Sequence, residues 1–148
     1  MSCPFCERED VKERIIIQND LAFAFPTNIP ITLGHTIITP KRCVKNLAQL
    51  TSEERSAILL LSDQIMKALA ETYDAEGFNC AWNQGNLAGQ SVQHFHLHII
   101  PRKEGDTGLL GYDPRSMLYR TGDREPSSQG SLMEVTNKIK KSIKNELS

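Results

Sequence analysis

One short run in the second half of the chain constrains its fold more than any other feature. Over residues 94–100, histidine stands at every second position and apolar residues fill the places between and after. In a β-strand, residues two apart point to the same face of the sheet. The run therefore predicts a strand that presents three imidazoles on one face and buries Phe95, Leu97 and Ile99 on the other.

These three histidines are the strongest candidate for a chemical site. The chain has four histidines in 148 residues, and three of them share this predicted face. Imidazole has an unperturbed pKa of about 6.5, so near neutral pH it can act as a nucleophile, a proton carrier or a metal ligand. A single histidine here would most simply be a structural residue, but chance explains three poorly.

A polar loop leads directly into the histidine run. Gly85 and Gly89 allow tight bends that expose backbone N–H groups to an anion, and Asn83, Gln90 and Ser91 add neutral donors. Alone, such a loop would be an ordinary connection between strands. Beside three histidines it predicts phosphate binding. The sequence contains neither a GxxxxGK[ST] nor a GxGxxG segment, so a P-loop or a dinucleotide-binding Rossmann site is unsupported.

The remaining pattern predicts an α+β domain built on an antiparallel sheet of about five strands. The strands are expected at residues 14–18, 21–26, 35–39, 78–84 and 94–100. The pair Asn19-Asp20 is expected to turn the chain between the first two strands. Short strands joined by turns, with one long helix between the third and the fourth, favour this class over a parallel α/β fold.

Two helices complete the predicted fold. The long one covers residues 51–73, where Thr51 and Glu54 form a capping box and apolar residues repeat on one face. The second covers residues 131–147 and has Ser131 and Glu134 as its expected cap.

We divide the chain into a domain at residues 1–104 and a C-terminal extension at residues 105–148. The extension begins with a segment rich in Gly, Pro, Ser and Asp, which predicts irregular structure, and ends with the second helix. We expect it to belong to the same compact unit or to pack on a partner.

Composition limits the possible partners. A net charge of −1 gives no general attraction to nucleic acid or to anionic membranes, and no apolar run approaches the length of a membrane span. We therefore expect a cytoplasmic protein that binds neither. In that compartment, four cysteines are thiols or metal ligands rather than disulfides.

The histidine motif resembles the signature of the histidine triad (HIT) family of nucleotide hydrolases and transferases. In this chain it follows Ala-Gly-Gln-Ser at residues 88–91 and precedes Pro101-Arg102. Residues 34–41, Gly-His-Thr-Ile-Ile-Thr-Pro-Lys, are similar to another recurrent segment of that family. The resemblance covers about residues 3–102 and is closest to zinc-binding, bacterial-type members.

The resemblance implies a nucleotidyl hydrolase or transferase that acts on the α-phosphate of dinucleoside polyphosphates or nucleoside phosphoramidates. His96, the middle histidine, matches the family nucleophile, and the central place of this imidazole agrees. His98 is expected to stabilise charge on the phosphate, and His35 to support the triplet, although a purely structural His35 is equally consistent. Binding residues around the phosphate are expected to be Asn83, Gly89, Gln90, Ser91 and His98.

Ribose recognition departs from the family pattern. The family often has Asn or Asp eight residues before the position of His35, where this chain has Thr27 followed by Asn28. Either residue is a candidate. We expect a purine nucleotide or dinucleotide substrate, with a divalent cation accompanying its phosphates.

The pair Cys3 and Cys6 forms a C-x-x-C motif with more than one possible function. A redox motif would require a thioredoxin-like βαβ unit, which the pattern does not predict, and free thiols are a further alternative. The resemblance implies one structural zinc ion, with Cys43 and His94 as the other two ligands.

Two other function classes compete with an enzyme of this family. One is a nucleotide-binding interaction module with only incidental catalysis. The other is a catalytic metal centre made from the three histidines, which the lack of a carboxylate partner disfavours. The resemblance also implies a homodimer, for which the uncovered sheet edge at residues 78–84 and the helix at 51–73 are the expected interface.

Overall fold

The computed structural model describes residues 2–106 and 125–147. Its centre is a five-stranded antiparallel sheet in the order β1-β2-β3-β5-β4. The strands are β1 (Ile17–Gln18), β2 (Ala22–Pro26), β3 (Thr36–Pro40), β4 (Gly77–Ala81) and β5 (Leu97–Arg102). The predicted α+β class and strand number are confirmed.

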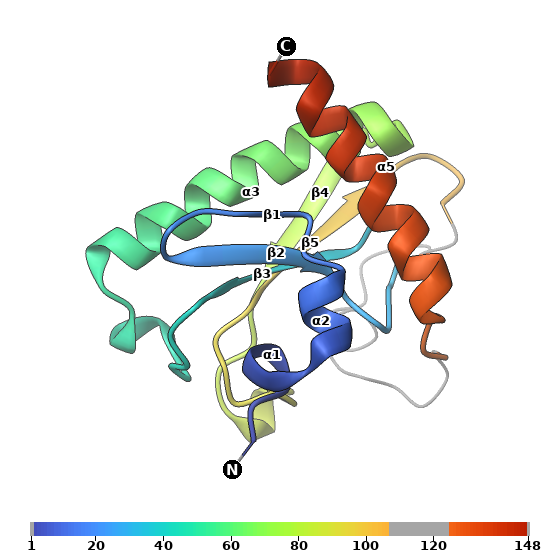
Figure 1. Cartoon of the computed structure of the whole chain (residues 1–148). Coiled ribbons are helices and arrows are strands. Elements are labelled where there is room, and N and C mark those ends of the chain that lie inside the picture. The colour runs from blue at the N-terminus through green and yellow to red at the C-terminus, as the bar shows by residue number, and fades with distance from the viewer. Residues whose placement is uncertain (1, 107–124, 148) are drawn as a thin grey trace.

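Helices cover both faces of this sheet (Figure 1). The long helix α3 (Ser52–Tyr73) packs on β2, β3 and β5, and α5 (Gln129–Leu147) packs on α3 and β2. The short helices α1 (Pro4–Glu7) and α2 (Glu9–Glu13) lie on the opposite side. Two 3₁₀ turns, η1 (Leu47–Gln49) and η2 (Asn86–Ala88), lie in the connections.

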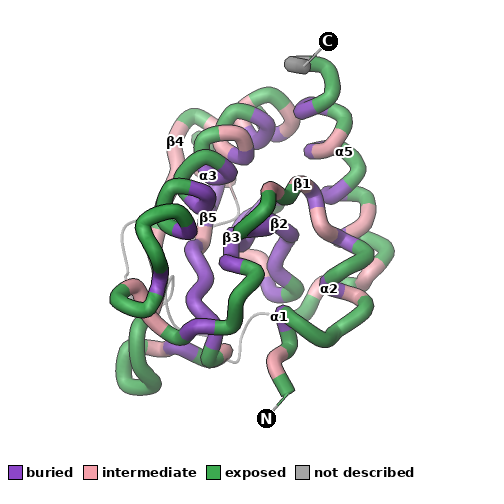
Figure 2. Tube along the Cα trace, turned by 60° about the vertical axis from the view of Figure 1, so that its left-hand side comes forward, coloured by how far each residue is buried: buried purple, intermediate pink, exposed green. Residues whose placement is uncertain are grey.

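Because both faces are covered, the central strands are buried on both sides (Figure 2). Alternate residues of β2 divide between two cores. Ala22 and Ala24 join the large core beneath α3 and α5, whereas Phe23 and Phe25 join a smaller aromatic core with Phe5 of α1. The smaller core is the floor on which the candidate site is built.

The strongest local signals are confirmed. Thr51 Oγ1 accepts a hydrogen bond from Glu54 N at 3.1 Å, and Glu54 Oε1 accepts one from Thr51 N at 2.9 Å, which is a complete capping box. The turn between β1 and β2 also forms as predicted, because Asn19 Oδ1 accepts bonds from Leu21 N and Ala22 N.

The predicted strand ends were less accurate. The first strand was predicted at residues 14–18, but β1 contains only Ile17–Gln18. Residues 9–13 form the unpredicted helix α2, and residues 14–16 connect this helix to β1. β4 ends at Ala81 rather than at residue 84, and β5 begins at Leu97 rather than at residue 94. The predicted alternation of side chains between the two faces nevertheless extends upstream of β5, since Phe95 lies in the large core while His94 and His96 lie outside it.

The predicted cap of the last helix was wrong. α5 begins at Gln129, and Ser128 Oγ accepts the hydrogen bond from Ser131 N at 3.1 Å, so Ser128 takes the role expected of Ser131. Val135, Ile139 and Ile143 of α5 lie in the same core as α3. The helix thus packs on its own chain. Residues 107–124 of the predicted irregular segment lie outside the described residues.

Among the described residues, every helix is too short or too polar to cross a bilayer.

Candidate functional site

A cavity of about 250 Å³ opens between the short N-terminal helices and the aromatic face of the sheet. Its volume lies just below the range of about 300–1,000 Å³ that is typical of small-molecule sites. His96, His98 and His35 line it, together with residues from the loop that precedes β5. The predicted histidines therefore share a cavity, with the exception of His94.

His96 is fixed in one orientation by its own backbone neighbourhood. Its side chain is buried, and its Nδ1 lies 2.7 Å from the backbone oxygen of His94. A carbonyl oxygen only accepts, so Nδ1 carries the proton and Nε2 keeps the lone pair. Burial lowers the pKa of His96 below its ordinary value, which favours the neutral, nucleophilic imidazole.

His35 and His98 form a second imidazole pair whose proton positions follow from one backbone donor. Ile31 N–H donates to His35 Nδ1 at 3.0 Å, so the neutral His35 ring carries its proton on Nε2. That nitrogen lies 2.9 Å from His98 Nδ1 and donates to it. His98 then carries its own proton on Nε2, which makes that nitrogen a donor.

A glycine places His35 for this bond. Gly34 has φ +95°, and a Cβ there would lie 3.0 Å from side-chain atoms of Leu69 and Tyr73 on α3. Both the backbone conformation and the close approach of α3 favour glycine. The loop can therefore pass beneath α3 and deliver His35 to His98.

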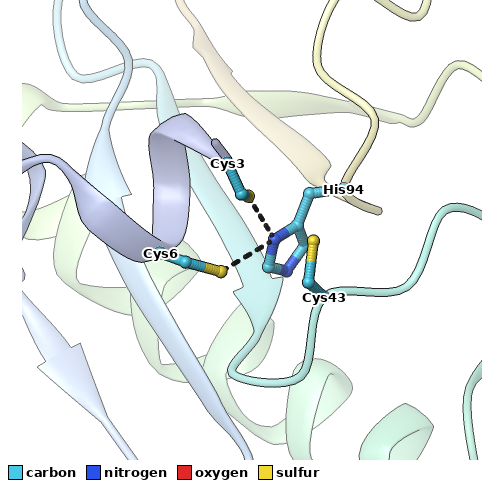
Figure 3. Close-up of side chains that lie close together, drawn as sticks. All are labelled: Cys3, Cys6, Cys43 and His94. Carbon is cyan, nitrogen blue, oxygen red and sulfur yellow. Dashed lines mark hydrogen bonds between the residues drawn. The ribbon is translucent and has the colours of Figure 1, made fainter. Parts of the chain in front are cut away.

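His94 belongs to a different cluster, on the side of α1 (Figure 3). Its Nε2 donates to Pro40 O at 2.7 Å, which leaves Nδ1 as the lone-pair nitrogen. The sulfur atoms of Cys3 and Cys6 lie 3.2 and 3.6 Å from that nitrogen. A histidine that binds a metal through one ring nitrogen usually donates the N–H of its other ring nitrogen to a group such as a backbone carbonyl.

The structure brings the predicted metal-ligand set together. One ligand atom from each of Cys3, Cys6, Cys43 and His94 lies within 4.8 Å of the other three. Burial, together with the neighbouring Cys3 thiol, raises the pKa of Cys6 to about 12, so in the absence of a cation the Cys6 thiol resists ionisation. Three sulfurs and one imidazole around a common centre suit a tetrahedral soft cation.

Helix α1 connects the two sites. Phe5 lies between Cys3 and Cys6 in sequence, and its ring meets His96 edge-on with a centroid distance of 5.1 Å. The same ring lies 5.2 Å from Phe25 of β2. A cation held by the two cysteines would thus stabilise the position of one wall of the cavity.

The predicted phosphate-loop residues divide into two groups. Asn83, Gly89 and Ser91 line the cavity. Gln90 does not: its Oε1 accepts from Gly85 N at 2.8 Å and its Nε2 donates to Lys45 O at 2.9 Å. The Gln90 side chain is buried and braces the loop from behind.

Both candidates for ribose recognition, Thr27 and Asn28, line the same cavity. The sequence analysis did not predict the two charged residues that line the cavity, Arg8 and Arg14, which flank the unpredicted helix α2 as its N-cap and C-cap residues. Helix signals at residues 4–13 were available, since Pro4 occupies the first helical position and acidic residues occupy the first turns.

Comparison with known families gives a match over most of this region. Residues 8–105 match the HIT domain.

Two relatives have names that state an activity. The chain is 30% identical over 131 residues to a bis(5'-adenosyl)-triphosphatase of Dictyostelium discoideum, covering 87% of this chain and 85% of that protein. It is 31% identical over 143 residues to an adenosine 5'-monophosphoramidase of Schizosaccharomyces pombe, covering 95% of this chain and all of the other. Both names describe hydrolysis at the phosphate of an adenine nucleotide.

Solved structures share the fold. A zinc-bound histidine triad family protein from Mycobacterium smegmatis superposes with a TM-score of 0.73 at 24% identity, covering 98% of this chain and 95% of that one. This similarity shows the common α+β architecture.

Proposed function

This chain belongs to the HIT domain family, whose relatives support a nucleotide hydrolase, and from that premise we propose that it acts through a covalent nucleotidyl-His96 intermediate. The substrates are dinucleoside polyphosphates or nucleoside phosphoramidates. The observation that carries the proposal is the 2.7 Å bond from His96 Nδ1 to His94 O, which leaves Nε2 with its lone pair in a cavity-lining imidazole.

The reaction has two displacements at the α-phosphorus. In the first, the His96 Nε2 lone pair forms a P–N bond while the bond from phosphorus to the leaving group breaks, and the leaving group takes a proton from solvent. In the second, water adds to phosphorus and releases a proton to solvent, while the P–N bond breaks and its electron pair returns to Nε2. The products are a nucleoside monophosphate and the protonated leaving group.

His98 and the loop act on the phosphate rather than on the bond electrons. The proton on His98 Nε2, which follows from the His35 contact, gives a donor for a non-bridging oxygen as charge develops. Asn83 and Ser91 are further donors at that end of the cavity. The His94 carbonyl stabilises the positive charge that His96 carries in the intermediate.

The test is a panel of adenosine phosphoramidates and diadenosine polyphosphates offered to the wild type and to His96→Ala. We expect the variant to bind adenosine monophosphate while turnover falls by several orders of magnitude, as for loss of a covalent route. Denaturation during turnover should trap the adduct on His96 in the wild type only. Binding without turnover of any substrate would instead favour a nucleotide-binding module.

We also propose that Cys3, Cys6, Cys43 and His94 hold one structural zinc ion. The donor set, the spacing of the ligand atoms and the orientation of His94 support this. With four protein ligands the coordination shell is complete, so the metal stabilises the fold and takes no part in the chemical step.

The assembly that we propose is a homodimer. β4 lies at an edge of the sheet, where its outer hydrogen-bonding groups face away from β5. Leu59 and Leu60 of α3 are each 66% exposed, which is costly for two adjacent leucines in a monomer. Two-fold pairing that covers this edge and helix accounts for both features.

A further inference from the structure

Arg14 is a buried cation in the wall of the cavity, and the mechanism above gives it no role. Only 3% of the residue is exposed. Its Nε donates to Pro26 O at 3.0 Å, and its Nη1 donates to the backbone and the carboxylate of Asp10. Nη1 also donates to Gln129 Oε1 at 3.0 Å, so three segments hold the guanidinium in place.

The remaining nitrogen of this guanidinium has no such bond. Within the described part of the chain, Arg14 Nη2 has no hydrogen-bond acceptor. Nη2 is also not one of the described side-chain atoms that are both sealed from solvent and without a partner, so it is accessible to solvent. Because Arg14 lines the cavity, a ligand atom that accepts hydrogen bonds would satisfy it.

Strand register shows which end of the cavity Arg14 occupies. Phe25 of β2 pairs with Ile37 of β3, and Ile37 pairs with His98 of β5, so the three side chains form one row on one face. Two strand spacings, about 10 Å, separate the ends of that row. The Arg14 guanidinium lies over the Phe25 ring at 5.7 Å, so it occupies the end away from His98.

With the phosphate at His96 and His98, that far end is where the base of a nucleotide would lie. Phe5, Val11 and Phe25 offer it apolar surface there. None of the described residues that line the cavity is acidic, so no carboxylate is present to accept from an amino group on the base. The charged groups at this end, Arg8 and Arg14, only donate.

We propose that Arg14 makes the cavity selective for a 6-oxopurine, as in guanine or hypoxanthine nucleotides, over adenine. The oxygen of such a base accepts from the guanidinium, whereas the amino group that adenine carries there only donates. The proposal rests on the proposed function for the placement of the phosphate at His96. It concerns the identity of the base and leaves the chemical step unchanged.

The test compares inosine and adenosine 5'-phosphoramidates, which share one leaving group, and measures binding of inosine and adenosine monophosphates. For the wild type we expect kcat/KM and affinity to favour the inosine compound about tenfold, as for one hydrogen bond to a charged group. Arg14→Met should bring both ratios near one. Each ratio comes from a single preparation, so the fraction of folded protein cancels.

Gln129→Ala is the matched control, because it removes a partner of Arg14 and leaves the guanidinium. It should retain the wild-type ratios. A wild-type ratio near one, or a ratio that Arg14→Met leaves unchanged, overturns the selectivity. If Arg14→Met does not fold, Arg14→Lys and the wild-type ratio still decide the question. Selective binding without turnover would overturn the hydrolase and keep the selectivity, whereas equal turnover of both bases would do the reverse.

Discussion

The tasks proposed for His94 and His96 differ because different ring nitrogens of the two imidazoles are bound to carbonyl oxygens. His94 donates through Nε2 to Pro40 O, which turns Nδ1 toward the thiols of Cys3 and Cys6. His96 donates through Nδ1 to His94 O, which leaves Nε2 for the cavity. A single hydrogen bond from each imidazole thus distinguishes the proposed metal ligand from the proposed nucleophile.

The lowered pKa of His96 predicts that kcat/KM declines in acid at a lower pH than an ordinary imidazole would give. Burial lowers its pKa below the ordinary 6.5, and the nucleophile must be neutral. We therefore expect kcat/KM to stay level as the pH falls from about 8 to 6.5, and to decline only at lower pH, once the imidazole becomes protonated. Initial rates at low substrate in overlapping buffers measure this. An acid limb centred at or above 6.5 would contradict the prediction.

The cysteine cluster predicts which thiol substitution affects the metal. Cys43→Ser should lose zinc to a chelator concentration that the wild type withstands, because one soft ligand is gone. At a metal concentration a hundred times Kd, full loss removes roughly 3 kcal/mol of stability, visible as a lower Tm.

Cys80→Ser is the control for this experiment, since Cys80 is an exposed thiol outside the cluster. Metal analysis should find close to one zinc per chain in the wild type and in Cys80→Ser. A wild type that is free of zinc after purification without a histidine tag would rule out the site.

At the level of elements, the start of α3 is tied to the segment that carries Cys43. Glu54 caps the helix through Thr51 N and also accepts from Arg42 Nη2 at 2.7 Å. The bonds from Arg42 hold the pKa of the Glu54 carboxyl below its ordinary value. The cap thus orients the helix and fixes the residue before Cys43.

We predict that Glu54→Ala lowers the free energy of unfolding by about 1–2 kcal/mol at pH 7, through loss of the capping box. The lowered pKa means that the charge of Glu54 stabilises the fold above pH 4.5 and ceases to do so as the pH falls through the folded value. The difference from the wild type should therefore shrink in acid. Urea unfolding checks both statements.

Glu53→Ala serves as the matched substitution, since Glu53 lies in the same first turn but is exposed. Its effect should remain within about 0.5 kcal/mol. Equal effects at positions 53 and 54 would argue against the cap.

For the molecule as a whole, the two cores decide where function is located. α3 and α5 close the large core on one face of the sheet, which leaves the aromatic face to α1, α2 and the cavity. The cavity on that second face is lined by His35, His96 and His98. The exposed leucines of α3 and the edge strand β4 are left for the proposed dimer interface.

Light scattering at micromolar concentration should therefore give twice the chain mass of 16.6 kDa. Replacing both Leu59 and Leu60 with lysine should shift the mass toward that of the monomer, because both leucine side chains would be buried in the proposed interface. Leu87→Lys is the control, since Leu87 is 98% exposed on η2 rather than on α3. A wild type that scatters as a monomer ends this proposal.

Short-range patterns were sufficient for the features that depend on neighbours in sequence. The alternation around His96, the capping box at Thr51 and the turn at Asn19 were all predicted, because each depends on residues within a few positions. The metal-ligand set followed from the resemblance to a family. Spacing alone left the C-x-x-C pair ambiguous.

Tertiary structure decided the features whose partners are distant. Gln90 turned from the cavity to a backbone oxygen 45 residues away, and Arg14 was positioned partly by Gln129, 115 residues away. No local periodicity contains such contacts, because they exist only after the sheet and both helix layers have formed. The sequence by itself determined which side chains could do the chemistry, and packing determined which of them face the ligand.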